Sequence, residues 1–323
     1  MIFLRKPDIK LGKWKFYQVK LEDKTVFNNY LKASQWPVNL WSANFPFIWA
    51  FGQSPQRKLL WRIIDGLLVT FVLNKDNILS LLCLPFGSGN IDTLINVLYK
   101  SMSYCKDWNG KKGPKTRLRT INSEQLEYLQ TSSSFNDLFK IKQLRGLERH
   151  YSTPELIALQ GKKFESLRKT LNRFYRKYPK IELKEYIPAY YKDILVFNEE
   201  WEKKARNKYS TIFDRIYFKE ILKNQRELDM LVLVAFYDNK VVGVNLSNLA
   251  PKAEGWGCIC KSNKEFEGLN EALVLAMVKK IYALNNSSKY LNVGSDMGNK
   301  GLMQFKEKFR PVKNLERYRL YIK

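Results

Sequence analysis

A short polar turn near the carboxyl end of the chain has the residue types of a ligand-binding site. Residues 290–293 have the apolar character of a buried strand, residues 294–298 (GSDMG) read as a turn, and residues 300–309 have the pattern of a short amphipathic helix closed by Pro311. Where a strand passes through a glycine turn into a helix, backbone N–H groups gather at the strand's carboxyl end, and open α/β sheets bind ligands there. We therefore expect an active site to border this turn.

A second candidate surface is the basic helix expected within residues 161–180. Its apolar side chains fall on one face at helical spacing, and Lys162, Lys169, Arg173 and Arg176 fall on the opposite face. Like charges on one face of a helix repel each other, which favours an anionic partner. The alternative is a solvated face whose charges pair with acids elsewhere in the chain.

The whole chain is strongly basic. Its 323 residues include 56 Lys and Arg against 31 Asp and Glu, a net charge of +25, and both halves share the excess. Such a charge favours a polyanionic partner, either nucleic acid or an anionic lipid surface. The alternative is a surface whose charge serves solubility alone.

Metal and nucleophile chemistry are not indicated. Cys83, Cys105, Cys258 and Cys260 have neither zinc nor disulfide spacing, so we expect small buried thiols in a reducing cytoplasm and no metal. His150 is the only histidine and has no recognisable nucleophile partner, so we do not expect it to be catalytic.

The order of elements that positions these residues occurs twice. Strands are expected at 66–73 and 78–84 before a helix from 91, and at 230–237, 241–249 and 256–260 before a helix at 268–284. We expect two α/β (α+β) units, 1–148 and 149–323, each with a mixed, mostly antiparallel sheet flanked by helices. Residues 34–55, which are rich in Trp and Phe, read either as a stacking or acyl-binding surface or as a packing segment.

Several motifs resemble a known bacterial family. They are LQGKKF at 159–164, LNRF at 171–174, DMG at 296–298 and PFGSG at 85–89, with Asn292, Lys306 and Arg310. The second half resembles the acyltransferase fold of the GCN-related N-acetyltransferases. The combination is similar to the soluble relatives of the C-terminal domain of phosphatidylglycerol lysyltransferases, and the resemblance covers essentially the whole chain.

The resemblance implies two tandem acetyltransferase-like domains, the second of which carries the active site. It also implies an aminoacyl-tRNA donor, whose ester is attacked by an amino group or hydroxyl of a lipid headgroup, a peptide or a small molecule. The basic face that carries Lys162, Lys169, Arg173 and Arg176 would suit the tRNA backbone. An activated ester needs little more than positioning, a proton acceptor and a donor for the oxyanion.

The resemblance also suggests roles for single residues. Asp296 is expected to act as general base or to orient the acceptor, and Lys306 and Arg310 to bind phosphate or stabilise the oxyanion. Asn292 and the backbone at Gly298 are expected to position the acyl carbonyl. The alternatives are that Asp296 caps the helix or holds the turn, that Lys306 is solvated, and that Gly298 only supplies a positive φ.

The chain departs from the related enzymes in two ways. Residues 265–270 (EFEGLN) place carboxylates where acetyl-CoA enzymes of this fold grip a pyrophosphate, so we expect no cofactor, although acyl-CoA is not excluded. There is no uncharged run of ~18 residues, so we expect a cytoplasmic protein without a transmembrane segment. Peripheral contact with the inner face of an anionic membrane stays open. The alternatives to the aminoacyltransferase are an acyl-CoA-dependent N-acyltransferase and a non-catalytic binding protein.

Overall fold

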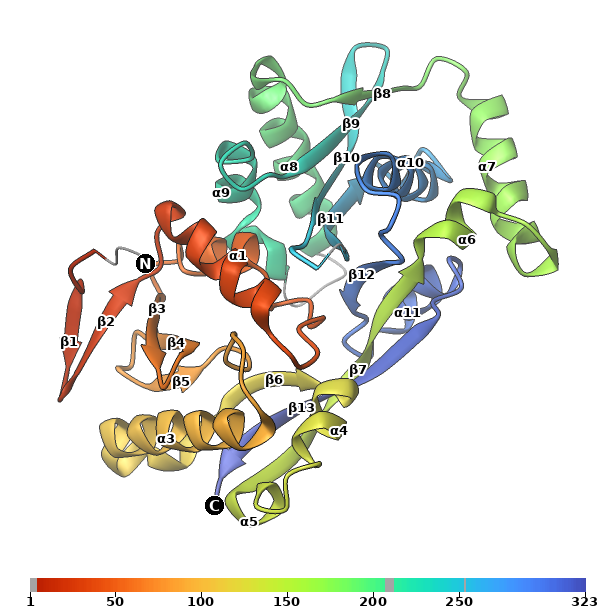
Figure 1. The fold of residues 1–323 in the computed structure, drawn as a ribbon. Coiled ribbons are helices and arrows are strands. Elements are labelled where there is room, and N and C mark those ends of the chain that lie inside the picture. The colour runs from red at the N-terminus through yellow and green to blue at the C-terminus, as the bar shows by residue number, and fades with distance from the viewer. Residues whose placement is uncertain (1–4, 207–211, 253) are drawn as a thin grey trace. The chain divides into compact units, whose positions relative to one another are not determined.

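The computed structural model describes residues 5–206, 212–252 and 254–323, and the chain divides into two compact units (Figure 1). The first unit comprises Met1–Glu148 together with Leu315–Lys323, and the second comprises Arg149–Asn314. The chain passes from the first unit to the second after residue 148. The C-terminal segment Leu315–Lys323, however, belongs to the first unit and not to the second.

The first unit is built on a sheet with the strand order β1-β2-β3-β4-β5-β6-β13. Its neighbouring strands pair antiparallel except for the parallel pair β5–β6. The elements are β1 (Ile9–Leu11), β2 (Trp14–Gln18), α1 (Lys24–Ala33), α2 (Phe45–Phe51), β3 (Arg57–Ile64), β4 (Leu67–Asn74), β5 (Leu79–Leu81), α3 (Ile91–Asn109), β6 (Leu118–Asn122), α4 (Ser123–Leu129), α5 (Phe135–Leu138) and β13 (Lys313–Ile322). The long strand β7 (Phe139–Ser152) leads out of this unit into the next.

The core of the first unit joins α3 to the strands. Phe71 on β4, Leu98 on α3 and Leu118 on β6 belong to one buried apolar cluster. The helix α3 is capped by Asn90, whose side chain accepts a hydrogen bond from the Thr93 N–H at 2.9 Å. Because this cap fixes the start of α3, the apolar face of the helix is set in register with the sheet.

The aromatic segment 34–55 is a packing segment. Trp36, Phe45, Phe47 and Trp49 each expose less than a tenth of their surface. The indole N–H of Trp36 donates to the carbonyl of Pro85 at 3.0 Å. Of the two alternatives for this segment, the structure supports the packing role, because these rings are not available to stack on a base or to enter a membrane surface.

The second unit has the strand order β7-β12-β11-β10-β9-β8. The strands β8 to β11 pair antiparallel, whereas β11 and β12 pair in parallel. The elements are α6 (Thr153–Ala158), α7 (Glu165–Lys177), β8 (Glu182–Glu185), α8 (Tyr191–Arg206), α9 (Phe218–Lys223), β9 (Leu231–Tyr237), β10 (Lys240–Leu249), β11 (Gly255–Ser262), α10 (Leu269–Leu284), β12 (Tyr290–Ser295) and α11 (Lys300–Glu307), with a short 3-10 helix at Lys162–Phe164 before α7.

The core of the second unit fixes the end of β12. Leu273 and Met277 on α10 pack in one cluster with Phe174 on α7 and Leu291 on β12. The strand β12 pairs with β11 through Leu291 and Asn292, and it continues to Ser295 before the chain turns into α11. The turn therefore lies at the carboxyl end of a strand that is held on both sides, as the sequence predicted.

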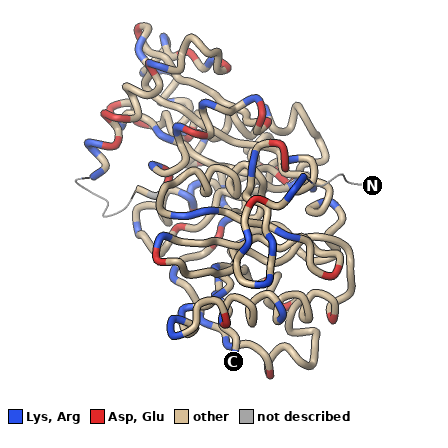
Figure 2. The backbone as a smooth tube through the Cα atoms, turned by 90° about the vertical axis from the view of Figure 1, so that its left-hand side faces the viewer, with Lys and Arg blue, Asp and Glu red and all other residues tan. Residues whose placement is uncertain are grey.

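Lys and Arg positions, blue in Figure 2, are spread along the whole described backbone and are not confined to one part of it. In the described part of the chain, no helix is both long and apolar enough to cross a membrane. The mixed, mostly antiparallel architecture confirms the expected fold class.

The four cysteines give a first testable prediction: Cys83 and Cys105 are buried, and Cys258 and Cys260 are partly buried. Burial raises the pKa of the Cys83 and Cys260 thiols to about 12 and raises the pKa of Cys105 and Cys258 well above the ordinary value. At pH 8 only about one in 10⁴ of a thiol with such a pKa is thiolate, which is the reactive form. We expect almost no reaction of the native protein with a thiol-specific dye over minutes, and reaction of all four cysteines in guanidinium. Rapid stoichiometric labelling of the native protein would contradict these environments.

Candidate active site

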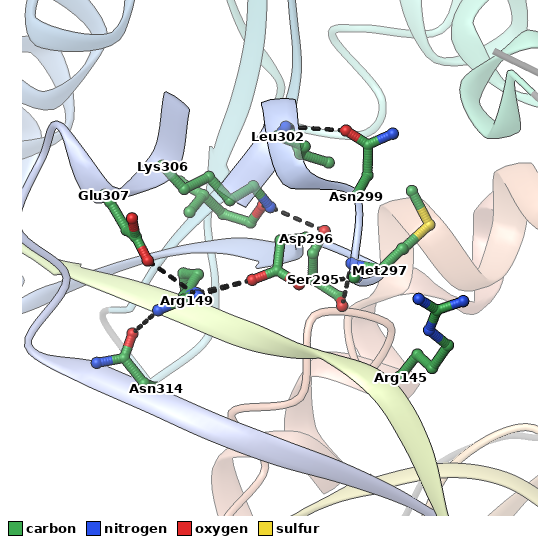
Figure 3. A network of polar contacts seen from close by, with 12 residues as sticks. Arg145, Arg149, Ser295, Asp296, Met297, Asn299, Leu302, Lys306, Glu307 and Asn314 are labelled. Carbon is green, nitrogen blue, oxygen red and sulfur yellow. Dashed lines mark hydrogen bonds and ion pairs between the residues drawn. The ribbon is translucent and has the colours of Figure 1, made fainter. Parts of the chain in front are cut away.

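Asp296 is buried although it lies in a turn, with only 2% of its surface exposed. One carboxylate oxygen, Oδ2, accepts hydrogen bonds from Nε and Nη2 of Arg149 at 3.0 and 2.9 Å (Figure 3). The other, Oδ1, accepts a hydrogen bond from the Gly298 N–H at 3.0 Å. A guanidinium that donates twice to a carboxylate fixes its position and orientation. The helix α11 is capped by Asn299, not by Asp296. Of the expected roles, this geometry favours an orienting or turn-holding Asp296 over a helix cap.

Arg149 lies near the end of β7 and was not singled out by the sequence analysis. Its side chain is only 7% exposed, and beyond Asp296 it donates from Nη1 to Oδ1 of Asn314. Its Nη2 also lies 3.7 Å from Oε1 of Glu307 on α11 (Figure 3). One guanidinium thus ties the turn to α11 and to the start of β13. It is the centre of the polar network in this unit.

Lys306 on α11 is directed at the strand and not at solvent. It is 6% exposed, and its Nζ donates to the carbonyl oxygens of Val293, Gly294 and Ser295 at 2.6, 2.8 and 3.0 Å. An ammonium group has three N–H donors, and these three carbonyls match them. The solvated alternative for Lys306 is therefore wrong. Its geometry is that of a residue that holds the carboxyl end of β12, and a role toward phosphate or an oxyanion stays a prediction.

The contacts of Lys306 predict a large effect on stability. Replacing Lys306 by methionine keeps the apolar stem but leaves three carbonyls of the strand end without their charged donor. This change should lower the unfolding free energy by about 2–4 kcal/mol. Urea unfolding of the two proteins measures the difference. Lys300→Met, at the exposed start of the same helix, is the matched control and should change stability by less than about 0.5 kcal/mol. Equal stability of the two variants would contradict the structural role of Lys306.

The remaining predicted residues of the turn shape its backbone. Oδ1 of Asn292 accepts the Gly294 N–H at 2.8 Å, and Asn292 is 3% exposed. Gly298 has φ of +67°, and the preceding Met297 also adopts a positive φ of +53°. Gly298 thus supplies a positive φ, and its N–H donates to Oδ1 of Asp296. A role of Asn292 or Gly298 toward an acyl carbonyl stays a prediction.

The basic residues predicted on α7 line one open groove. The groove has a volume of about 1170 Å³, and its lining residues are Lys162, Lys163, Glu165, Ser166, Lys169, Thr170, Asn172, Arg173, Arg176 and Arg310. Six of these ten residues are basic and one is acidic. Arg310, which follows α11, is held there by a hydrogen bond from its Nε to the carbonyl of Lys163 at 2.9 Å. The fold therefore brings the predicted basic face together with a predicted arginine from a distant part of the sequence.

The start of α10 carries acids, as the sequence indicated. Glu267 pairs with Arg173 at 2.5 Å, and Glu265 lies 3.9 Å from Lys204. Gly268 has φ of +97°, and a Cβ on it would lie 2.8 Å from Cβ of Phe174. The glycine is therefore required by packing against α7. A bulky residue at Gly268 would disturb this packing whatever ligand the protein binds, so such a substitution cannot be used to test for acyl-CoA binding.

The lone histidine lies in the interior of the second unit. His150 is fully buried, and its Nδ1 lies 2.7 Å from Oε1 of Glu254. Across residues 5–206, 212–252 and 254–323, no group of three His, Cys, Asp or Glu side chains is arranged to hold a metal ion.

Comparison with known proteins places the chain in a family. Residues 120–321 match the family described as phosphatidylglycerol lysyltransferase, C-terminal. This match spans more than half of the chain. None of the curated proteins matches the chain.

Solved structures share the fold at low sequence identity. A conserved protein of unknown function from Bacteroides thetaiotaomicron VPI-5482 is 20% identical with a TM-score of 0.81, over 95% of this chain and 99% of that chain. L-PGS from Bacillus licheniformis is 17% identical with a TM-score of 0.64, over 94% and 92%. A tandem GNAT protein from the clavulanic acid biosynthesis pathway is 9% identical with a TM-score of 0.52, over 95% and 98%. These likenesses confirm the expected tandem acetyltransferase-like fold.

Proposed function

We propose, because the chain belongs to the phosphatidylglycerol lysyltransferase C-terminal family, that the protein is an aminoacyl-tRNA-dependent aminoacyltransferase. An amino group or hydroxyl of a lipid, peptide or small-molecule acceptor attacks the ester carbonyl of the aminoacyl-tRNA. The new bond forms to the carbonyl carbon, the ester bond to the terminal ribose breaks, and the ribose oxygen leaves with a proton. The ester is already activated, so positioning and oxyanion stabilisation suffice.

The observation that carries the proposal is the basic groove on α7. Its six basic side chains face solvent around a single acid, which suits the phosphate backbone of an RNA strand. The ion pairs Lys169–Glu165 and Arg173–Glu267 are exposed, so exchanging them for phosphate contacts costs little. Arg310 connects this groove to α11, whose other end begins at the turn with Asp296. The helix α11 therefore connects the proposed donor-binding groove to the polar network around Asp296.

Within this proposal the polar network orients the reactants. Arg149 and Lys306 hold the turn from two sides, and Asp296 is the orienting carboxylate. Arg310 and the α7 face hold the tRNA. Because the three N–H donors of Lys306 are held by carbonyls, the exposed Arg310 supplies the charge that stabilises the oxyanion when the donor is bound.

The acyl-CoA alternative has less support. Two carboxylates, Glu265 and Glu267, lie at the start of α10, where the pyrophosphate of CoA would have to bind. Coenzyme A added to the protein is expected to leave its melting temperature unchanged. A saturable rise would favour the N-acyltransferase.

The proposed reaction is tested by following a labelled amino acid. Pooled radiolabelled aminoacyl-tRNA is mixed with the protein, with and without a crude extract that supplies lipids, peptides and metabolites, and the label is located by extraction and chromatography. We expect extract-dependent transfer of the label. A variant with Lys169, Arg173 and Arg176 all changed to glutamine should lose most of this transfer, because these side chains line the groove proposed to bind the tRNA. The variant should still fold, because these side chains are exposed.

The matched control changes the same number of exposed charges elsewhere. Lys111, Lys115 and Lys140 of the first unit are exposed, and their change to glutamine should leave transfer unaltered. If the label stays on tRNA with every extract, the aminoacyltransferase proposal fails. If both triple variants lose transfer equally, net charge rather than the α7 groove is responsible, and the groove loses its assigned role.

A further inference from the structure

Four arginines gather on the sheet of the first unit. Arg57 begins β3, Arg117 and Arg119 lie two residues apart at β6, and Arg319 lies on β13. Residues two apart on a strand share a face, so Arg117 and Arg119 lie on the same side of the sheet. Leu118, which lies between them, pairs with Leu320, the neighbour of Arg319. Nε of Arg319 lies 3.4 Å from the carbonyl of Arg119. Three strands that are separated in sequence thus bring these guanidinium groups together.

An aromatic ring forms a common support for two of them. The guanidinium carbon of Arg57 lies 4.1 Å from the ring centroid of Phe51, at the end of α2, and that of Arg119 lies 5.4 Å from it. Planar guanidinium groups stack on aromatic faces in this way and keep their N–H donors free at the edges. Arg57 and Arg119 are therefore held against one ring from two strands.

The positive charges of these arginines act on one another. Burial, followed by the positive charges of Arg117, Arg57 and Arg319, lowers the pKa of Arg119 to about 10. Burial and the charge of Arg319 also lower the pKa of Arg117. Among the described residues, no carboxylate forms an ion pair with any of the four. The fold holds like charges close together at a cost in free energy, which an anionic ligand would offset.

The arginines also present unused donors. Nη1 of Arg57 and Nε of Arg117 are buried and, in the part of the chain that the structure describes, have no hydrogen-bond partner. Most buried polar groups in proteins are hydrogen-bonded. Guanidinium donors match the oxygens of phosphate in paired, charge-assisted hydrogen bonds.

We propose that Arg57, Arg117, Arg119 and Arg319 form a binding site for a phosphoryl group, carried either by a soluble diphosphate or phosphate ester or by the headgroup of an anionic lipid. Several arginines and no acid suit a group with many acceptor oxygens better than a single carboxylate. The site lies wholly in the first unit, and the α7 groove lies wholly in the second. The inference does not rest on the proposed function, although a phosphorylated acceptor would connect the two.

The test is calorimetric titration with inorganic pyrophosphate. To remove the contribution of the α7 groove, all proteins carry the Lys169→Gln, Arg173→Gln and Arg176→Gln changes. We expect binding at one site, and weakening by about ten-fold or more on Arg119→Gln, since one charged hydrogen-bonding group is lost. Arg57→Gln should weaken binding in the same direction.

The chain offers a matched control in Arg62. It also lies on β3, its guanidinium carbon lies 4.4 Å from the ring centroid of Trp14, and it too has buried donors without a partner. Burial lowers the pKa of Arg62, Tyr104, Asp65 and Tyr17 oppose this change, and no second arginine contributes to it. Arg62→Gln should therefore leave pyrophosphate binding unaltered. Equal weakening by Arg62→Gln and Arg119→Gln would overturn the site.

A stability measurement separates a ligand site from a structural cluster. Without added anion, Arg119→Gln should melt at the same or a higher temperature than its parent, because the substitution relieves repulsion. With pyrophosphate the parent should gain stability and the variant should gain much less. A clear loss of stability in the variant without anion would show that Arg119 serves the fold, and would overturn the proposal.

Vesicles distinguish a lipid headgroup from a soluble phosphate. Phosphatidylcholine vesicles with and without phosphatidylglycerol are sedimented with the same proteins. Co-sedimentation that needs phosphatidylglycerol and is lost on Arg119→Gln assigns the site to a lipid headgroup. Pyrophosphate binding without co-sedimentation assigns the site to a soluble ligand. The absence of both pyrophosphate binding and co-sedimentation would overturn the site.

Discussion

Changing Arg149 to methionine is expected to lower the unfolding free energy by about 3–5 kcal/mol, because it leaves the buried carboxyl group of Asp296 without its main partner. The side chains of Arg149 and Asp296 are 7% and 2% exposed, so water cannot replace the lost hydrogen bonds. Arg149 also donates to Asn314 on the adjoining strand, and this contact is lost as well. Urea unfolding at neutral pH measures the effect.

Two further variants show which contact is responsible. Glu307 lies 3.7 Å from Arg149 but is 49% exposed, so Glu307→Gln should change stability by no more than about 1 kcal/mol. The double variant Arg149→Met, Asp296→Leu removes both buried charges and should recover much of the loss. If Arg149→Met alone changes stability as little as Glu307→Gln does, the buried pair is not a main support of the turn.

The same double variant separates stability from chemistry. If Asp296 and Arg149 orient the reactants, the double variant should fold and still fail to transfer the labelled amino acid. If it folds and transfers normally, the pair serves only the fold, and the roles proposed for the turn would have to be assigned to other residues. Stability and transfer measured on one protein therefore give separate answers.

Local patterns predicted the parts of the fold that local interactions determine. The apolar face of α10, the turn between β9 and β10 and the glycine turn after β12 each depend on residues that are close in sequence. The basic face of α7 was also visible, because helical spacing alone puts Lys169, Arg173 and Arg176 on one side. These elements lie within a few residues of the expected positions.

Long-range pairing decided what the sequence could not predict. The strand β7 contains the run KIKQLRGLER, in which charges obscure the alternation of a half-buried strand, and β13 is similarly polar. Both strands are stabilised by neighbours far away in the sequence. For the same reason Arg149 was missed, since its partner Asp296 lies 147 residues away. Likewise, spacing gave no sign that Lys306 turns inward onto three carbonyls.

Removing the three basic side chains Lys169, Arg173 and Arg176 is expected to weaken tRNA binding by roughly 30- to 100-fold at low salt. These residues line one groove with Arg310, so a phosphate backbone that follows the groove would contact several of them together. Each lost phosphate contact should also lower the salt dependence of log K by about 0.7–0.9. Fluorescence anisotropy with labelled tRNA between low and moderate salt measures both quantities.

The salt dependence is the stronger part of this prediction, because it reports contacts and not merely charge. The control with Lys111, Lys115 and Lys140 changed to glutamine has the same net charge as the α7 variant. It should slow association slightly through the weaker long-range field, but it should keep the full salt slope, since none of its side chains lines the groove. Equal slopes for the wild-type and α7 proteins would mean that tRNA does not lie along α7. The aminoacyl-tRNA proposal would then lose the observation that carries it, whatever the family of the chain.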